Sequence, residues 1–249
     1  MKNRIDKVAL ILAAGKGKRM KSDMPKALHK LDGRYIVDHV IDSARKAGID
    51  RQILVIGHLA EKVRKALAAH DVEFVTQIPQ LGTGHAVMMA EPLLKGFDGD
   101  LVILLGDMPL VKPETIKNLI RKRHQLGAAA MVLTAVLDDP GMYGRIVRDQ
   151  HGYLKAIVEY RDADETVRKI KEVNTGAFCF DWKELEGILG RLDDRNEQKE
   201  YYLTDSVALM VADGKKVGAE VVADPVEGLG INSLDELARM EKIIKSGTR

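Results

Sequence analysis

The sequence is short of cysteine and of net charge, and each shortage excludes a class of protein. Cys179 is the only cysteine among the 249 residues, so no disulfide can form within the chain, and the sequence suits a reducing compartment such as the cytoplasm. Lysine and arginine contribute 39 side chains and aspartate and glutamate 37, which leaves a net charge of +2. So small an excess argues against binding nucleic acid through a broad basic surface.

Long apolar runs and metal-binding motifs are also missing. The first apolar stretch, residues 8–14, is too short for a signal-peptide core or a membrane span, and it runs directly into glycines. The seven histidines are scattered and show no metal-ligand spacing such as HExxH. With 45% hydrophobic and 31% charged residues, the composition is that of a soluble globular protein. We therefore expect a cytoplasmic protein without a membrane partner.

The first half of the chain alternates strand and helix patterns. Continuous apolar runs predict buried strands, and apolar residues at helical spacing predict helices. The expected strands are 8–13, 53–56, 72–75, 101–105 and 128–136, and the expected helices are 36–44, 59–69, 84–94 and 113–126. Strands separated by helices pair in parallel with right-handed crossovers. The fold class is therefore α/β, with a doubly wound, mostly parallel, Rossmann-like sheet and a site at the carboxyl ends of its strands.

The pattern changes in the second half. Residues 144–158 predict a β-hairpin with His151-Gly152 near its turn. Further strands are expected at 173–180 and 216–222, and helices at 184–192 and 201–212. Ser233, with Glu236 three residues later, forms a capping-box pattern that begins a last helix.

The glycine-rich loop after the first strand is the sharpest functional feature. It reads Leu12-Ala13-Ala14-Gly15-Lys16-Gly17-Lys18-Arg19-Met20, and Pro25-Lys26 follows. Glycines allow backbone N–H groups to approach an anion closely, and the basic side chains add positive charge. The third glycine of a dinucleotide fingerprint is missing at Met20, and the Ser or Thr of a Walker loop is missing after Lys18. The long stretch before the next helix leaves room for a triphosphate under a flap, although an ordinary basic surface loop would also show these residues.

Further short segments follow the loop in an order typical of one family. They are Gln77–Ala86, Gly106–Leu110, Tyr143–Val147, Ile157–Glu159, Glu172–Gly176, Glu200–Asp205 and Gly230–Asn232. Together with the loop they resemble sugar nucleotidyltransferases, and in particular the uridyltransferase domain of bifunctional N-acetylglucosamine-1-phosphate enzymes. The resemblance covers nearly the whole chain, from about Val8 to Glu241. It implies transfer of UMP from UTP to a sugar 1-phosphate, N-acetylglucosamine 1-phosphate, with release of pyrophosphate.

The resemblance also implies how the chain is divided. Residues 1–249 are expected to form one nucleotidyltransferase domain. Within it we expect a nucleotide-binding half at about 1–139, a sugar-binding subregion with the hairpin at about 140–232, and a C-terminal helix at 233–249.

Asp107 directly follows a buried strand, where a carboxylate can hold Mg²⁺ together with phosphate oxygens and water. Chemistry alone leaves this role and that of a turn-forming aspartate open. The resemblance implies Mg²⁺ as the cofactor and Asn232 as its second protein ligand, although Asn232 could also be a turn residue before the last helix. It further implies that Arg19 and Lys26 are catalytic, because they would stabilise the transition state and the leaving pyrophosphate.

The substrate contacts implied by the resemblance fall into two sets. The nucleotide set is Leu12, Ala13, Ala14, Gly15, Gly17, Gln77, Gly82 and Thr83, and the sugar set is Gly144, Glu159, Asn174, Thr175, Tyr202 and Thr204. The amide of Gln77 can donate and accept, so it can pair with a pyrimidine edge. Glu159 and Asn174 can bond sugar hydroxyls, but each could also be an ordinary surface residue. Tyr202 could equally be a partly buried aromatic of a helix.

The sequence departs from the family at several points. Lys18 stands where relatives often have Thr, and residues 32–35 replace the more usual Gly-Lys-Pro run. Asn232 is followed by Ser233-Leu234, whereas relatives commonly have Asn or Asp and then Arg at these two positions. These changes concern substrate specificity more than chemistry. Bifunctional relatives continue into a β-helix acetyltransferase domain, whose hexapeptide repeats do not occur here, so we expect no acetyl transfer and a monomer. Alternatives are another NTP or sugar 1-phosphate on the same fold, a non-catalytic nucleotide-sugar sensor, and a dehydrogenase, which the missing glycine disfavours.

Overall fold

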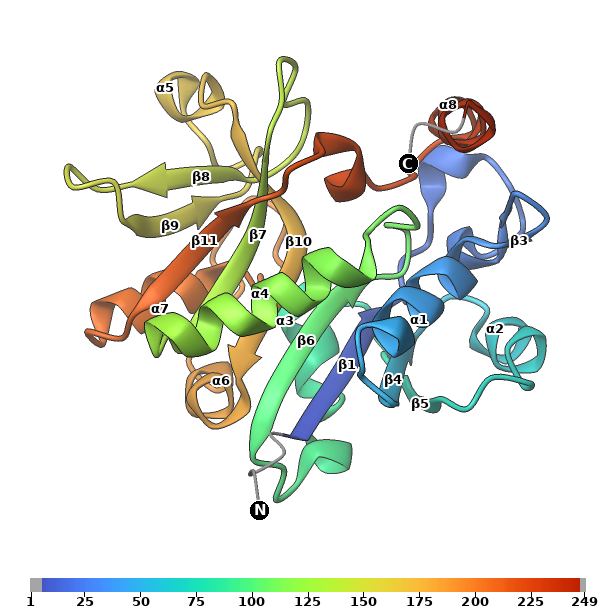
Figure 1. Ribbon diagram of the computed structural model, residues 1–249, viewed down its shortest axis with the longest axis horizontal. Coiled ribbons are helices and arrows are strands. Elements are labelled where there is room, and N and C mark those ends of the chain that lie inside the picture. The colour runs from blue at the N-terminus through green and yellow to red at the C-terminus, as the bar shows by residue number, and fades with distance from the viewer. Residues whose placement is uncertain (1–5, 247–249) are drawn as a thin grey trace.

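A mixed sheet forms the centre of the molecule, with its main strands in the order β11-β7-β10-β6-β1-β4-β5 (Figure 1). The structure is a computed structural model that describes residues 6–246. The strands are β1 (Asp6–Leu12), β4 (Arg51–Ile56), β5 (Glu73–Thr76), β6 (Gly99–Leu105), β7 (Ala130–Val136), β10 (Glu172–Asp181) and β11 (Val217–Val221). β1 pairs in parallel with β4 and β6, whereas β10 runs antiparallel between β6 and β7. The predicted α/β, mostly parallel fold class is confirmed.

Helices cover both faces of this sheet because its central strands bury apolar side chains on both sides. In β1, Ala9 and Ile11 face one side and Val8 and Leu10 the other, and all four are buried. Helices α1 (Ile36–Lys46) and α4 (Pro113–Leu126) pack on the first side. On the second side lie α3 (Thr83–Met88), α6 (Trp182–Leu189) and α7 (Asp205–Ala212). Figure 1 shows α1 and α4 crossing in front of the sheet.

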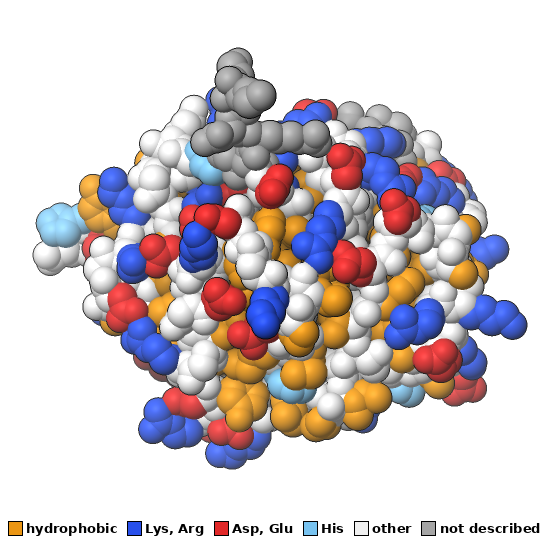
Figure 2. Space-filling model, turned by 90° about the horizontal axis from the view of Figure 1, so that it is seen from below, with side chains coloured by type: hydrophobic (Ala, Val, Ile, Leu, Met, Phe, Trp, Pro, Cys, Tyr) orange, Lys and Arg blue, Asp and Glu red, His pale blue; other side chains and the backbone are white. Residues whose placement is uncertain are grey.

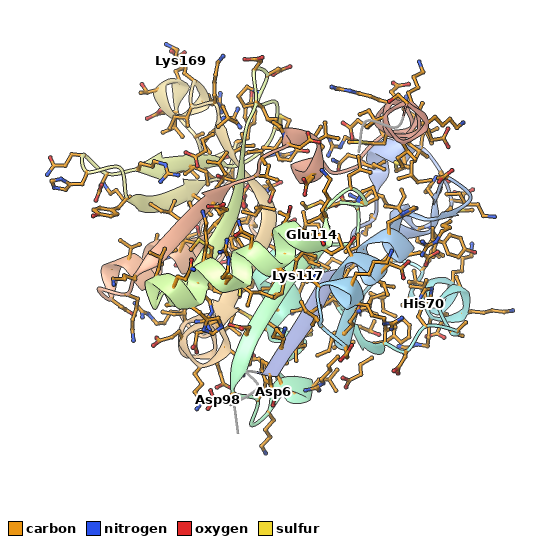
Figure 3. The ribbon with its side chains drawn as sticks, viewed as in Figure 1. Asp6, His70, Asp98, Glu114, Lys117 and Lys169 are labelled. Atoms are coloured by element: carbon orange, nitrogen blue, oxygen red, sulfur yellow. The ribbon has the colours of Figure 1, made fainter. Side chains whose placement is uncertain are left out.

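The outer surface carries both signs of charge. On α4, Ile116 and Leu119 face the core, while Glu114 and Lys117 point to solvent, 3.7 Å apart (Figure 3). In the face seen from below, basic and acidic side chains are interspersed (Figure 2). In the described part of the chain, no helix combines the length and apolar character needed to cross a membrane.

The predicted hairpin is confirmed. It consists of β8 (Arg145–Arg148) and β9 (Leu154–Val158), which pair antiparallel, with His151 and Gly152 in the turn between them. The short helix α5 (Glu165–Arg168) follows, and β8 meets the central sheet where Arg145 pairs with Val173 of β10. Strands β10 and β11, which lie within residues 140–232, therefore return to the sheet built by the first half of the chain.

Two predicted helices differ from the structure. The helix expected at 84–94 is two pieces, α3 and the 3-10 turn η3 (Glu91–Leu94), because Pro92 has no N–H with which to continue the first. The helix expected at 201–212 begins only at Asp205. Before it, Tyr201 bonds the backbone of the 81–84 loop, accepting from Gly84 N and donating to Leu81 O at 2.7 and 2.8 Å.

The segment between β1 and α1, where the sequence suggested a flap over a triphosphate, contains short regular elements. It contains the 3-10 turns η1 (Lys18–Met20) and η2 (Lys26–Leu28) and the small antiparallel pair β2 (Lys30–Leu31) and β3 (Arg34–Tyr35). Met20 and Leu31 are buried with Ile231 and with Met240 of the last helix, α8 (Leu234–Lys245). The remaining helices and turns are α2 (Ala60–Ala66) and η4 (Pro225–Gly228). Residues 247–249 of the predicted C-terminal helix and the side chain of Lys18 lie outside the described part.

A buried ion pair ties α4 to the end of the sheet opposite the carboxyl ends of β1 and β6. Asp100 of β6 is 0% exposed, and Arg123 of α4 contacts its Oδ1 from Nε at 2.7 Å and from Nη2 at 2.5 Å. His124 lies 2.8 Å from the other carboxylate oxygen. Arg123 also donates to the carbonyl of Ala128 at 2.9 Å. A carboxylate so deeply buried depends on these donors, because it has no solvent contact to replace them.

Replacing Arg123 with Met should lower the free energy of unfolding by about 3–5 kcal/mol, because it leaves the Asp100 carboxylate buried without its partner. Urea denaturation followed by circular dichroism measures this change. Arg121→Met is the matched control, since Arg121 lies on the same helix but is exposed and donates to the side chain of Asn118. Equal stability of the two variants would contradict a stabilising role for the pair.

Candidate active site

Two adjoining cavities open where β1 and β6 end. We call the first the loop cavity; it measures about 680 Å³ and is lined by residues 12–17, Lys26 and the 77–83 loop. The second, the hairpin cavity, measures about 890 Å³ and lies between residues 136–144, the ends of β9 and β10, and the first turns of α8. The residues common to both linings are Leu12, Thr83, Leu105 and Asp107. The two cavities therefore meet at the carboxyl ends of parallel strands, where α/β folds bind ligands.

Three charged or polar side chains that the sequence analysis selected as site residues meet at this junction. The ammonium group of Lys26 forms an ion pair with Asp107 and donates to Oδ1 of Asn232 at 3.1 Å. The backbone strengthens the arrangement, because Ile231 N–H donates to the carbonyl of Asp107 at 2.9 Å and Gly106 N–H to that of Leu12 at 2.9 Å. These contacts join three segments at one point: the end of β6, the residues around Lys26 and the segment before α8.

The oxygens at this point fit a hard divalent cation. Oδ1 of Asp107 is buried and has no hydrogen-bond partner. The amide oxygen of Asn232, the second type of donor expected for Mg²⁺, contacts the same ammonium group of Lys26 as the Asp107 carboxylate does. Within residues 6–246, no group of three or more His, Cys, Asp or Glu side chains could hold a metal by itself. Two protein oxygens completed by phosphate oxygens and water are the donor set that Mg²⁺ usually takes.

The glycine-rich loop brings its basic side chains toward both cavities. Gly17 has a φ of +59°, and a Cβ there would lie 2.9 Å from that of Lys26, so only glycine lets the chain pass so close. Buried Met20 anchors the turn that follows. Lys26 lines the loop cavity, whereas Arg19 is exposed and lines the hairpin cavity. The two predicted catalytic cations therefore belong to different cavities that share Asp107.

The 77–83 loop forms the far wall of the loop cavity. Gln77 is buried, and its Nε2 donates to the carbonyl of Gly82 at 2.8 Å and lies 3.1 Å from Nδ1 of His85. Burial lowers the pKa of His85, which favours the neutral ring that can accept at Nδ1. Both hydrogens of the Gln77 amide are then engaged within the loop, and its oxygen is left as the acceptor. Gln80, which the sequence analysis did not select, also lines this cavity and donates to the carbonyl of Ala14.

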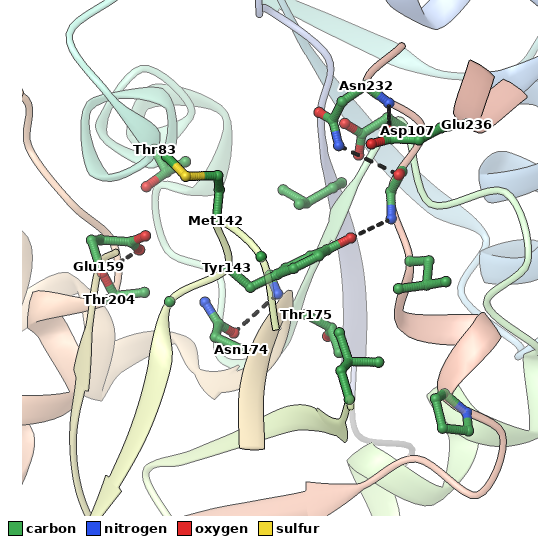
Figure 4. Close-up of a pocket in the computed structure, with 18 of the residues that line it drawn as sticks. Thr83, Asp107, Met142, Tyr143, Glu159, Asn174, Thr175, Thr204, Asn232 and Glu236 are labelled. Atoms are coloured by element: carbon green, nitrogen blue, oxygen red, sulfur yellow. Dashed lines mark hydrogen bonds between the residues drawn. The ribbon is translucent and has the colours of Figure 1, made fainter. Parts of the chain in front are cut away.

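Glu159 and Thr204 form a hydrogen-bonded pair in the hairpin cavity. The hydroxyl of Thr204 donates to Oε1 of Glu159 at 3.1 Å. Burial raises the pKa of Glu159, and the Thr204 hydroxyl acts in the opposite direction because it stabilises the charged form. A Cβ at Gly144 would lie 3.3 Å from Oε2 of Glu159, so glycine leaves the space beside this carboxylate open. In Figure 4 this pair lies across the cavity from Asp107 and Asn232, with Tyr143 between them.

The remaining predicted sugar contacts differ in position. Asn174 lines the cavity with its Oδ1 held by Gly176 N–H at 3.0 Å, which leaves its amide nitrogen as the available group. Thr175 also lines the cavity, but its hydroxyl donates to Leu133 O at 2.8 Å. Tyr202 is 6% exposed, accepts from Gln198 at 2.9 Å and is not brought to either cavity. Its burial raises its pKa to about 12.

Tyr143 and Glu236 line the hairpin cavity, although the sequence analysis did not select them. The hydroxyl of Tyr143 accepts from Gly230 N–H at 3.1 Å, and Oε2 of Glu236 accepts from Asn232 N–H at 2.5 Å. For Tyr143 the only signal was its place beside Gly144 in a family-like segment. For Glu236 it was the capping-box pattern, which predicts a helix start and no ligand contact.

Replacing Thr204 with Val should raise the pKa of Glu159 further, because it removes a donor to the carboxylate while keeping the side chain's shape. NMR titration of glutamate carboxyl carbons, with Glu159 assigned from the spectrum of a Glu159→Gln variant, measures the change. Thr166→Val, at an exposed position of α5, should leave this pKa unaltered. A Thr204→Val protein with the same Glu159 titration as wild type would show that the hydroxyl does not donate.

Comparison with known proteins gives one consistent match. A model of the MobA-like NTP transferase domain matches residues 9–172. The bifunctional protein GlmU of Clostridium botulinum is 47% identical over 239 residues, which are 96% of this chain and 52% of that protein. The GlmU protein of Streptococcus gordonii is 46% identical over 237 residues, 95% of this chain and 51% of the relative. The chain thus spans about half the length of the curated relatives it matches.

A solved structure shares the fold. The crystal structure of a UDP-glucose pyrophosphorylase complexed with UDP-glucose superposes with a TM-score of 0.77, covering 98% of this chain and 100% of the other. At 18% sequence identity this likeness shows a common architecture and nothing about substrates.

Proposed function

Since the chain belongs to the family of MobA-like NTP transferase domains, we propose that it transfers UMP from UTP to N-acetylglucosamine 1-phosphate, giving UDP-N-acetylglucosamine and pyrophosphate. The proposal rests chiefly on the two cavities that share Asp107, with Lys26 in one and Arg19 in the other. Such an arrangement suits two phosphorylated substrates whose reacting groups must meet. The similarity to GlmU proteins over 96% of the chain supports this substrate pair.

The loop cavity is the proposed UTP site. Backbone groups of residues 12–15 and Gly17 would lie along the nucleotide, with Thr83 and Gly82 on the opposite wall. The acceptor oxygen left on Gln77 favours a base that presents an N–H donor at that edge. Uracil presents such a donor at N3, whereas cytosine presents an acceptor there. This difference supports UTP over CTP.

The hairpin cavity is the proposed acceptor site. Glu159 can accept from neighbouring sugar hydroxyls, and the amide nitrogen of Asn174 can donate to a hydroxyl or phosphate oxygen. Gly144 supplies an opening beside Glu159, and Thr204 fixes that carboxylate. Thr175 forms part of the wall of the hairpin cavity, while the buried Tyr202 would support that wall by packing behind it. Mg²⁺ is the proposed cofactor, and the monomeric state and cytoplasmic location expected from the sequence stay predictions.

In the proposed reaction an oxygen of the sugar phosphate attacks the α-phosphorus of UTP. A P–O bond forms there as the bond to the β-phosphate oxygen breaks and pyrophosphate leaves. The attacking oxygen is already anionic, so no side chain needs to remove a proton. Lys26 and Arg19 would neutralise charge as it builds on the phosphates from the two sides, and positioning would supply most of the remaining acceleration. Mg²⁺ held by Asp107 and Asn232 would add further charge neutralisation at the phosphate oxygens.

Pyrophosphate release from the purified protein, measured with each of four NTPs, a panel of sugar 1-phosphates, and with or without Mg²⁺, tests the proposal. The highest rate is expected with UTP and N-acetylglucosamine 1-phosphate, and no release without Mg²⁺ or without the acceptor. A preference for another pair would correct the substrates. Calorimetric binding of UDP-N-acetylglucosamine without release from any pair would instead identify a nucleotide-sugar sensor.

Arg19→Ala and Asp107→Ala should each lower kcat on the order of a hundredfold or more, because each removes a charge placed at the reacting phosphates. Arg121→Ala and Asp98→Ala, which remove exposed charges outside both cavities, serve as controls and should keep near-normal turnover. Circular dichroism establishes that each variant is folded. Normal turnover in folded Arg19→Ala and Asp107→Ala would reject these roles.

A further inference from the structure

The first turn of α8 contains an altered capping box. The Ser233 hydroxyl accepts from Glu236 N–H at 3.2 Å, as a helix N-cap does. In the usual reciprocal contact, the Glu236 carboxylate would accept from Ser233 N–H. Here its Oε2 accepts instead from the preceding residue, Asn232, at 2.5 Å. The helix start is therefore capped by Ser233, and Glu236 is committed to the backbone of Asn232.

Asn232 is consequently held from several directions. Its neighbours donate to fixed acceptors on other elements: Gly230 N–H to the Tyr143 hydroxyl at 3.1 Å and Ile231 N–H to the Asp107 carbonyl at 2.9 Å. The side-chain amide nitrogen of Asn232 donates weakly to Gly230 O at 3.4 Å, and its oxygen accepts from the ammonium group of Lys26, which is also paired with Asp107. On the C-terminal side, the hydrogen bond from Asn232 N–H to the Glu236 carboxylate adds a further contact that holds Asn232 in place.

The helix that carries Glu236 is itself anchored to the glycine-rich loop. Met240 of α8 is 2% exposed and packs with Ile231 against Met20, which directly follows Arg19. The Glu236 carboxylate also lines the hairpin cavity, close enough to Tyr143 to contribute to the raised pKa of its hydroxyl, of which burial is the main cause. Glu236 thus lies on a rigid element beside the cavity and is not a freely moving surface side chain.

From these contacts we infer that Glu236 is a positioning residue that fixes Asn232 for metal binding, an inference that rests on the proposed function. Loss of its acceptor frees the Asn232 N–H and allows the segment before α8 to rotate. The amide oxygen then leaves its place beside Lys26, where it shares the ammonium group with the carboxylate of Asp107. Residues that orient metal ligands in this way typically change metal affinity by about 10–100-fold when removed.

Four variants separate this role from helix capping. Glu236→Ala removes the acceptor, and Glu236→Gln keeps an oxygen that can accept from the same N–H. Ser233→Ala removes the cap but not the contact to Asn232. Asp235→Ala removes a neighbouring exposed charge in the same helical turn and is the control for the helix dipole.

Two measurements are made on each variant: binding of Mn²⁺, alone and with UTP, by electron paramagnetic resonance, and the Mg²⁺ concentration giving half-maximal pyrophosphate release. For Glu236→Ala we expect Mn²⁺ binding to weaken by about 10–100-fold, with a similar rise in the Mg²⁺ requirement. Glu236→Gln should restore most of both. Ser233→Ala should lower the melting temperature, followed separately by circular dichroism, and neither Ser233→Ala nor Asp235→Ala should weaken metal binding appreciably.

Wild-type Mn²⁺ binding by a folded Glu236→Ala protein would overturn the inference. So would an equal loss of binding in Ser233→Ala, because helix stability would then explain the effect. Absence of pyrophosphate release from the wild-type protein would overturn the proposed function instead, and the Mn²⁺ titrations would still decide whether Glu236 orients the metal ligand.

Discussion

Lys26, Asp107 and Asn232 come from the loop after β1, the end of β6 and the segment before α8, and the ammonium group of Lys26 bonds to both of the others. Three distant parts of the chain therefore converge on one charged cluster. Their convergence makes the two cavities adjoin, because Asp107 forms part of both walls. Of the residues common to both walls, Asp107 is the charged one, and Lys26 holds it at the junction.

The sheet explains why the cluster forms where it does. Parallel β1 and β6 end side by side at Leu12 and Leu105, so the residues that follow them emerge at the same edge. Charges at the opposite edge have a different task. There Arg123 and His124 of α4 contact the buried carboxylate of Asp100, and these contacts hold α4 against the sheet. The same strand, β6, thus carries a structural carboxylate near its start, and the proposed metal ligand Asp107 lies just past its end.

Close packing around glycines gives the site its shape. Gly17 lets the loop turn back against Lys26. Gly144, which precedes β8, has no side chain to fill the space beside the carboxylate of Glu159, which follows β9. The aromatic side chain of Tyr143 then connects the hairpin to Gly230. Through this contact, and through that between Glu236 and Asn232, the C-terminal segment becomes part of the site and does more than cover the core.

Local patterns in the sequence were sufficient to predict the strands of the central sheet, most helices and the hairpin, because apolar periodicity and glycine placement act over a few residues. They did not predict the small pair β2–β3. The pairing of Lys26 with Asp107 joins residues 81 positions apart. The packing of Tyr202 outside both cavities and the contact of Glu236 with Asn232 involve near neighbours in the sequence, but their geometry follows from how the surrounding segments pack. Such contacts leave no periodic signal. Tyr201 and Leu203 likewise bond the distant 81–84 loop, the helix begins only at Asp205, and only the tertiary structure decided this.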